Sequence, residues 1–187
     1  WLDMFSPSNF LATNPEALQT ALDSGGASLV EGMRLFVQDF ARGRVSMTDD
    51  TAFEVGRNVA TTPGSVVFEN DLIQLIQYAP TTAKVHERPL LIVPPCINKY
   101  YILDLQPDNS LVAHAVAQGH AVFLVSWRNA GPEQGNLGWD DYLEQGVMQA
   151  IDVALAISGA DRANTLGFCI GGTLLASALA VLAARGE

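Results

Sequence analysis

The sequence predicts an α/β protein whose sheet is mainly parallel, with an antiparallel leading edge and a small helical segment before it. From Pro89 onward, short apolar runs alternate with segments of helical periodicity, which is the pattern of βαβ units. Before Pro89, strand-like runs are separated only by short turns, as antiparallel neighbours are. Hydrophobic residues make up 49% of the 187 residues, enough for a buried core. We therefore expect a helical segment over residues 1–54 and an α/β domain over residues 55–187.

Two helices are predicted in the first segment. Asn14 before Pro15 is a strong helix start, because Asn caps free N–H groups and Pro suits the first helical position. This helix should end at residues 24–26, and a second should run roughly from Ser28 to Ala41 and end at Gly43. The apolar residues of the second helix recur at helical spacing and are expected in the core: Leu29, Met33, Leu35, Phe36 and Phe40.

The strands follow from the change of period near Val55. The antiparallel meander is expected over three runs, namely Val59 to Thr62, Ser65 to Glu69 and Leu72 to Tyr78. The parallel part is expected as a strand at Pro89 to Val93, a helix at about Asp108 to Gln118, a strand at His120 to Trp127, a helix from Trp139 to Ile157, a strand at Ala163 to Phe168 and a helix at Ile170 to Ala184.

The last strand and helix flank a cysteine with glycines around it. Cys169 lies between Gly167, Gly171 and Gly172, which is the G-x-S-x-G nucleophile-elbow pattern with sulfur in place of oxygen. The N-terminus of the following helix favours a thiolate over a thiol, and the N–H of Ile170 can help to hold an oxyanion. The alternative interpretation is a buried glycine turn in which Cys169 is a small hydrophobe.

The pattern of an elbow after an antiparallel leading edge is typical of the α/β-hydrolase fold. In that fold, the loop after an earlier strand supplies the second oxyanion donor. Because Pro94 and Pro95 lack N–H groups, the first donors after that strand belong to Cys96 and Ile97. We therefore hypothesise that the N–H of Cys96 or Ile97 pairs with that of Ile170.

Composition excludes several classes of function. The net charge is −10 and Lys/Arg residues form no cluster, so a nucleic-acid partner has no electrostatic support and an anionic ligand would need local cations. The two cysteines have no metal-site spacing, and we expect no metal. Neither a signal peptide nor a membrane-spanning run is visible, so reduced thiols in the cytoplasm are expected.

The general base for Cys169 is not visible in this chain. In the α/β-hydrolase fold the catalytic acid and His follow the nucleophile, whereas His86, His114 and His120 all precede it. The chain also starts at Trp1 without an initiator Met and stops one helix after the elbow. We therefore expect a fragment, an incomplete α/β-hydrolase domain truncated after the elbow helix.

Four separated motifs resemble those of class I polyhydroxyalkanoate (PHA) synthases. They are the segments Pro94–Tyr101, Asp104–Pro107, Phe123–Arg128 and Gly167–Gly172. The resemblance implies an acyltransferase that polymerises (R)-3-hydroxyacyl-CoA, with 3-hydroxybutyryl-CoA the expected monomer, and releases CoA. Cys169 would carry the growing polyester as a thioester. The CoA thioester is a substrate, so no cofactor is expected.

The resemblance also implies features outside this chain. The family's His and Asp come from the C-terminal half of the catalytic core, after residue 187. A homodimer, the surface of PHA granules and phasin-type proteins are the implied partners and location, in the cytoplasm. The alternatives are another cysteine-nucleophile hydrolase, such as a thioesterase or a dienelactone hydrolase, or an inactive dimerisation or granule-binding fragment.

Overall fold

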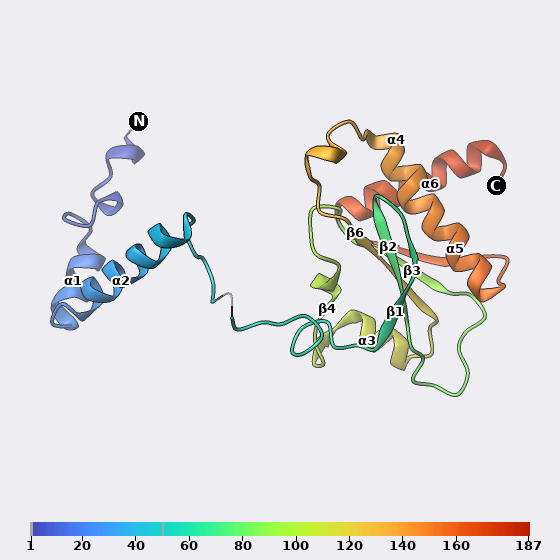
Figure 1. Cartoon of the computed structure of the whole chain (residues 1–187), viewed down its shortest axis with the longest axis horizontal. Coiled ribbons are helices and arrows are strands. Elements are labelled where there is room, and N and C mark those ends of the chain that lie inside the picture. Colours follow the sequence, from blue (N-terminus) through green and yellow to red (C-terminus); the bar gives the residue numbers. More distant parts are fainter. Residues whose placement is uncertain (1, 50) are drawn as a thin grey trace. The chain divides into compact units, whose positions relative to one another are not determined.

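The computed structural model describes residues 2–49 and 51–187, so Trp1 and Asp50 of the expected first segment lie outside the described residues. The chain divides into two compact units, Trp1–Ala52 and Phe53–Glu187, which we name unit 1 and unit 2 (Figure 1). Among the described residues no helix is long and apolar enough to cross a membrane.

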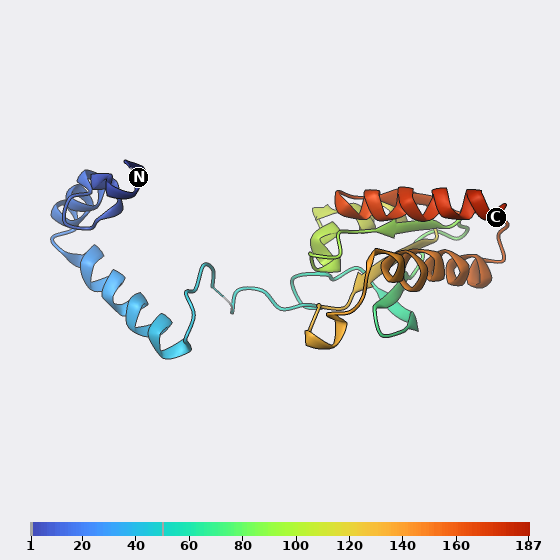
Figure 2. The ribbon, with the colours of Figure 1, turned by 90° about the horizontal axis from the view of Figure 1, so that it is seen from above.

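Unit 1 consists of two α-helices preceded by short 3-10 turns. The turns are η1 (Asp3–Phe5) and η2 (Pro7–Asn9), and the helices are α1 (Pro15–Asp23) and α2 (Ala27–Arg42). The predicted cap is confirmed, because the side-chain oxygen of Asn14 accepts hydrogen bonds from the N–H groups of Glu16 and Ala17 at 2.9 and 3.2 Å. Gly43 ends α2 in the left-handed conformation, with φ of 69°. Figure 2 shows α2 as one helix that leads into a stretch without helix or strand.

The prediction that the apolar residues of α2 lie in a core is wrong. The apolar residues of α2 are exposed, with Phe40 at 81% and Met33 at 62% of their surface accessible. Neither α1 nor α2 has a buried residue among those described. A pair of short helices has no third layer to cover its apolar stripe, so the period predicts the helix correctly but not its burial.

Unit 2 is built on a five-stranded sheet with the order β1-β2-β6-β3-β7. Its strands are β1 (Gly64–Glu69), β2 (Ile73–Tyr78), β3 (Leu90–Val93), β6 (Val122–Trp127) and β7 (Asn164–Gly167). β2 is antiparallel to both its neighbours, while β3 is parallel to β6 and β7. The prediction of a mainly parallel sheet with an antiparallel edge is therefore confirmed.

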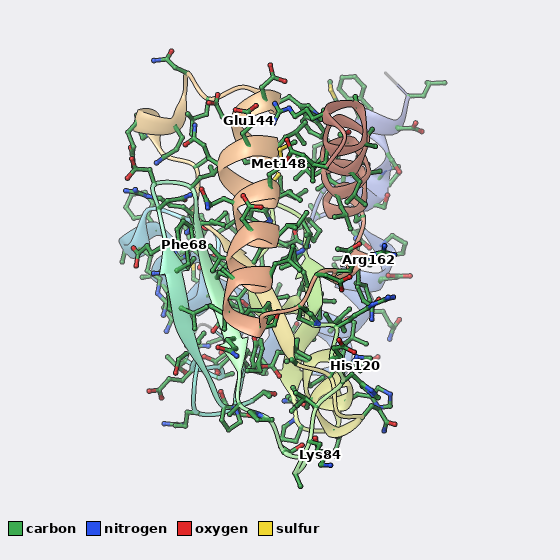
Figure 3. All side chains as sticks on the ribbon, turned by 90° about the vertical axis from the view of Figure 1, so that its right-hand side faces the viewer. Phe68, Lys84, His120, Glu144, Met148 and Arg162 are labelled. Carbon is green, nitrogen blue, oxygen red and sulfur yellow. The ribbon has the colours of Figure 1, made fainter. Side chains whose placement is uncertain are left out.

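Helices cover both faces of this sheet. They are α3 (Leu111–Ala117), α4 (Trp139–Asp141), a π-helical stretch η5 (Tyr142–Met148), α5 (Gln149–Ser158) and α6 (Ile170–Arg185). Alternate residues of β6 enter the two core clusters, with Phe123 facing η5, α5 and α6, and Leu124 facing α3. In Figure 3, η5 and α5 form one upright helical run beside α6, and Glu144 and Met148 of η5 are hydrogen-bonded to Arg185 of α6.

Two predicted elements near Asp104 differ from the structure. Residues 59–62 are not a strand: Val59 forms only an isolated bridge with Val55, and Ala60 has φ of 55°. The Ala60 N–H donates to the carbonyl of Asp104 at 2.9 Å, so tertiary contacts override the β propensity of this run. The predicted helix at Asp108 begins later, because a small hairpin of β4 (Asp104–Gln106) and β5 (Asn109–Ser110) precedes α3.

Candidate active site

Cys169 occupies a strained corner between β7 and α6. Its φ of 54° and ψ of −126° lie in a region that residues other than glycine rarely adopt. Among the described residues only Ala60 shares a positive φ without being glycine. The Cys169 side chain is exposed and its thiol is free. The corner therefore presents the sulfur to solvent at the N-terminus of a 16-residue helix.

The glycines of the motif are required by close backbone approach. A Cβ at Gly167 would lie 2.5 Å from the Cα of Gly172. A Cβ at Gly171 would collide with the carbonyl of Val93 and with the backbone of Pro94. These contacts bring the first turn of α6 against the end of β7 and the end of β3, so a side chain at either position would force the elbow apart.

The loop after β3 lies against the elbow. The N–H of Phe168 donates to the carbonyl of Val93 at 3.1 Å, and the indole N–H of Trp127 donates to the carbonyl of Pro94 at 2.8 Å. The backbone is thus fixed on both sides just before the predicted oxyanion donors. In the described part of the chain, the N–H groups of Cys96, Ile97 and Ile170 donate to no carbonyl.

The two thiols have different surroundings. Cys96 is half-buried and packs against the main core cluster, whereas Cys169 is exposed. Burial raises the pKa of the Cys96 thiol above its ordinary value. A raised pKa leaves less thiolate at neutral pH, so Cys96 is a poor nucleophile compared with an ordinary exposed thiol.

The histidines lie away from this corner. His86 precedes β3 and His120 precedes β6, with ring centroids 4.8 Å apart, at the amino ends of the parallel strands. Cys169 follows the carboxyl end of β7, and the carboxyl ends of the parallel strands lie at the opposite end of the sheet from these two histidines. Among the described residues no group of three or more His, Cys, Asp or Glu side chains could hold a metal ion.

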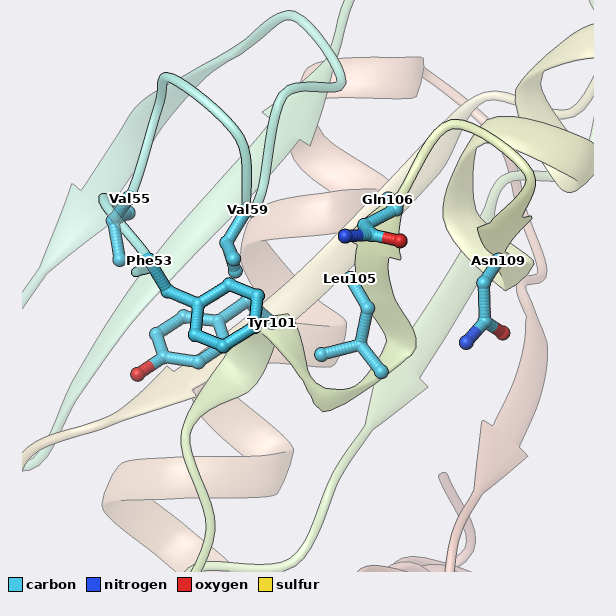
Figure 4. A pocket seen from close by; sticks show the side chains of 7 residues that line it. All are labelled: Phe53, Val55, Val59, Tyr101, Leu105, Gln106 and Asn109. Atoms are coloured by element: carbon cyan, nitrogen blue, oxygen red, sulfur yellow. The ribbon is translucent and has the colours of Figure 1, made fainter. Parts of the chain in front are cut away.

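A cavity lies in unit 2 away from Cys169 (Figure 4). It encloses about 450 Å³ and is lined mainly by apolar side chains, with the Gln106 and Asn109 amides at one side. Its lining consists of Phe53, Val55, Val59, Tyr101, Leu105, Gln106 and Asn109. Cys169 is not part of this lining. Sequence reasoning did not find the cavity because its walls join residues 53–59 to the short elements of residues 100–110, which are separated in the sequence.

Sequence reasoning also missed the environment of Asp104. The sequence offers only the short motif Asp104–Pro107, which is typical of a loop. In the structure the Asp104 side chain is buried, with 2% of the residue exposed. The burial of Asp104 depends on residues that are distant in the sequence, so no local pattern predicts it.

Comparison with known proteins gives a consistent picture. Residues 1–115 match the family model described as the N-terminus of poly-beta-hydroxybutyrate polymerase (PhaC). The whole chain is 63% identical over 187 residues to the poly(3-hydroxyalkanoate) polymerase subunit PhaC of Cupriavidus necator, covering 32% of that protein. It is 49% identical over 190 residues to the poly(3-hydroxyalkanoate) polymerase of Methylorubrum extorquens, covering 31% of it. For the Rhizobium meliloti subunit, 97% of the chain aligns at 43% identity with 30% of the relative. The chain thus spans about a third of the length of these relatives.

Proposed function

The chain belongs to the poly-beta-hydroxybutyrate polymerase (PhaC) family, and from this premise we propose that it supplies the nucleophile of a polyester-forming acyltransferase. The substrate is an (R)-3-hydroxyacyl-CoA, with 3-hydroxybutyryl-CoA the expected monomer, and the products are the polyester and free CoA. The observation that carries this proposal is the strained, exposed position of Cys169 at the start of α6.

The first chemical step is acyl transfer to sulfur. The Cys169 thiolate attacks the carbonyl carbon of the substrate thioester, a new C–S bond forms, and the bond to CoA sulfur breaks. CoA leaves as a thiolate and takes the proton that Cys169 gave up. Because one thioester replaces another, the step is nearly balanced in free energy, and a thiolate suits it better than an alkoxide.

The growing chain then lengthens by ester formation. The hydroxyl oxygen of the next monomer attacks the carbonyl of the Cys169 thioester, its proton goes to a base, and the ester that forms displaces the Cys169 thiolate. The lengthened chain returns to Cys169 with release of CoA. Because His86 and His120 lie at the opposite end of the parallel strands and His114 lies within α3, we assign the base to the His and assisting Asp that the family resemblance places later in the catalytic core.

The oxyanion of both steps needs donors near Cys169. We assign the N–H of Ile170, at the first position of α6, together with that of Cys96 or Ile97 in the loop after β3. The support is that the glycine contacts bring Gly171 against Val93 and Pro94, which directly precede that loop. A preorganised donor pair of this kind is worth on the order of 10²–10³ in rate per donor.

We further propose an α/β-hydrolase fold for the complete domain, with this chain forming its first strands and its elbow. The strand order and the one antiparallel strand, β2, within the described five-stranded sheet support that proposal. A homodimer acting in the cytoplasm at the PHA granule surface, with phasin-type proteins nearby, belongs to the same proposal. The thioesterase and dienelactone hydrolase alternatives have no support in the relatives, which are named polymerases.

The test is CoA release from (R)-3-hydroxybutyryl-CoA, followed with a thiol reagent in quenched aliquots. We would compare the 187-residue chain, the same chain joined to the downstream portion of the Cupriavidus necator relative, and both with Cys169→Ala. We expect turnover only in the joined protein, and its loss with Cys169→Ala. Turnover that survives Cys169→Ala would overturn the assignment of Cys169. A loss of turnover in Cys96→Ala as large as that in Cys169→Ala would overturn it too.

A further inference from the structure

Asp104 is a buried acid that ties three segments of unit 2 together. Its Oδ1 accepts hydrogen bonds from the hydroxyls of Thr62 and Ser110, both at 2.6 Å. Its main-chain carbonyl accepts the N–H of Ala60 at 2.9 Å. The side chain therefore links the segment before β1 to β4 and to the N-cap of α3.

The hydrogen bonds to Asp104 are those that a carboxylate accepts. The Ser110 oxygen accepts the N–H of Ala113 at 2.8 Å, so its single proton is free to be donated to Asp104. Distances of 2.6 Å are typical of hydroxyl groups that donate to a charged oxygen. No ion pair of the described residues includes Asp104. Its negative charge is thus buried without a protein cation.

Two polar atoms beside this charge have no hydrogen-bond partner among the described residues. They are Asp104 Oδ2 and Tyr78 Oη, and both residues are more than nine-tenths buried. Both line one small cavity of about 180 Å³. Its other oxygen-bearing side chains are Thr62, Ser65 and Tyr100. Burial, and next the Asp104 charge, raise the pKa of Tyr78 and of Tyr100, so both are neutral phenols at neutral pH.

We propose that this cavity binds a small monovalent cation, of the size of sodium or potassium, against Asp104 Oδ2 and Tyr78 Oη. Oxygen-rich sites select hard cations. One carboxylate neutralises one positive charge, whereas Ca²⁺ sites normally use several carboxylates and carbonyls. A bridging water could satisfy the two orphan atoms but would leave the buried charge unbalanced. The cation is the occupant that answers both the hydrogen-bonding and the charge requirement.

The site would be structural, because it fixes the entry to the sheet. Ala60 is held in a strained left-handed conformation while its N–H bonds to Asp104. A cation that binds only the folded state multiplies the ratio of folded to unfolded protein by one plus the ratio of its concentration to its dissociation constant. At ten times its dissociation constant, this ratio rises roughly elevenfold.

The experiment compares thermal unfolding of the whole 187-residue chain in potassium, sodium and tetramethylammonium chloride at one ionic strength. We expect unfolding midpoints a few degrees higher in potassium or sodium than in tetramethylammonium. Tyr78→Phe should reduce this difference and Asp104→Asn should abolish it. Tyr101→Phe is the matched control, because Tyr101 lines the other cavity and should keep the full difference.

A second measurement locates the cation directly. Crystals grown with rubidium chloride should show an anomalous scattering peak between Asp104 and Tyr78. Equal midpoints in all three salts would mean that water suffices and would overturn the proposal. A salt-specific difference of wild-type size in Tyr78→Phe, or a rubidium peak elsewhere, would overturn the placement of the cation between Asp104 and Tyr78. Because Tyr78→Phe keeps the ring, the test remains decisive if Asp104→Asn fails to fold.

Discussion

At the scale of single residues, the elbow depends on positions where no side chain fits. Gly167 and Gly171 are held by backbone contacts from β7, α6 and the end of β3. Cys169 sits between them in a conformation that costs on the order of 1–3 kcal/mol. The surrounding close packing must supply that free energy, so the glycines and the cysteine form one structural feature.

Gly171→Ala should therefore destabilise unit 2 by about 1–3 kcal/mol, because the added methyl collides with the Val93 and Pro94 backbone. Urea unfolding monitored by circular dichroism measures the change. Gly32→Ala is the control, because nothing lies within 4 Å of a Cβ there and alanine is the better helix former. Equal effects of the two changes on the free energy of unfolding would contradict the crowding at the elbow.

The two cysteines should differ in reactivity and in its pH dependence. At neutral pH, iodoacetamide should modify the exposed Cys169 several-fold faster than Cys96, whose pKa is raised by burial. The rate at Cys96 should keep rising above about pH 8.5, the ordinary thiol pKa, because its thiolate forms only there. Peptide mass spectrometry of wild type, Cys96→Ala and Cys169→Ala assigns each rate. Equal rates at pH 7 would count against the distinction.

At the scale of elements, β6 connects the core to the candidate site. Trp127 at its end packs against η5, where a Cβ at Gly146 would lie 2.6 Å from the indole ring. The same indole donates to the carbonyl of Pro94, directly before the predicted oxyanion donors. One side chain thus links the packing of the helices to the shape of the loop after β3.

Trp127→Phe should cost about 1–3 kcal/mol of stability, because the buried carbonyl of Pro94 loses its donor. Amide hydrogen exchange at Phe168, whose N–H donates to the carbonyl of Val93, should also become faster, since the backbone after β3 is no longer held. Trp139→Phe is the matched control: Trp139 is 45% exposed, and its change should stay within about 0.5 kcal/mol. Unchanged exchange in Trp127→Phe would show that the loop is fixed by other contacts.

At the scale of the whole molecule, the phenols of the buried Tyr78 and the half-buried Tyr100 make folding sensitive to alkaline pH. Tyr78 and Tyr100 have raised pKa values in the folded chain, chiefly because of burial. In the unfolded chain, phenols lose their protons from about pH 10. Above pH 10 the unfolded state therefore releases more protons than the folded state. The free energy of unfolding keeps its full value below about pH 10 and falls as the pH rises further.

Stability measured by urea unfolding should thus decline as the pH rises above about 10. The decline should be shallower in Tyr78→Phe and shallower still with Tyr100→Phe added, because neither phenylalanine can ionise. The absorbance of tyrosinate near 295 nm reports the same titration in the folded chain. A double variant with the wild-type slope would refute the role of these two residues.

Local chemistry allowed much of this fold to be predicted from the sequence. The Asn14 cap, the apolar strands β3 and β6, and the glycines around Cys169 are signals carried by neighbouring residues. Each depends on backbone hydrogen bonding or sterics within a few positions, so sequence alone specifies it.

Only the tertiary structure decided the rest. It turned residues 59–62 away from a strand and buried Asp104, because the partners Ala60, Thr62 and Ser110 are brought together by the fold. It also left the apolar stripe of α2 exposed, since burial depends on what packs against a helix and not on its period. The sequence by itself determined most of the helices and strands and the place of the glycine corner around Cys169. The non-local contacts, which no window of sequence contains, decided which polar groups are buried together.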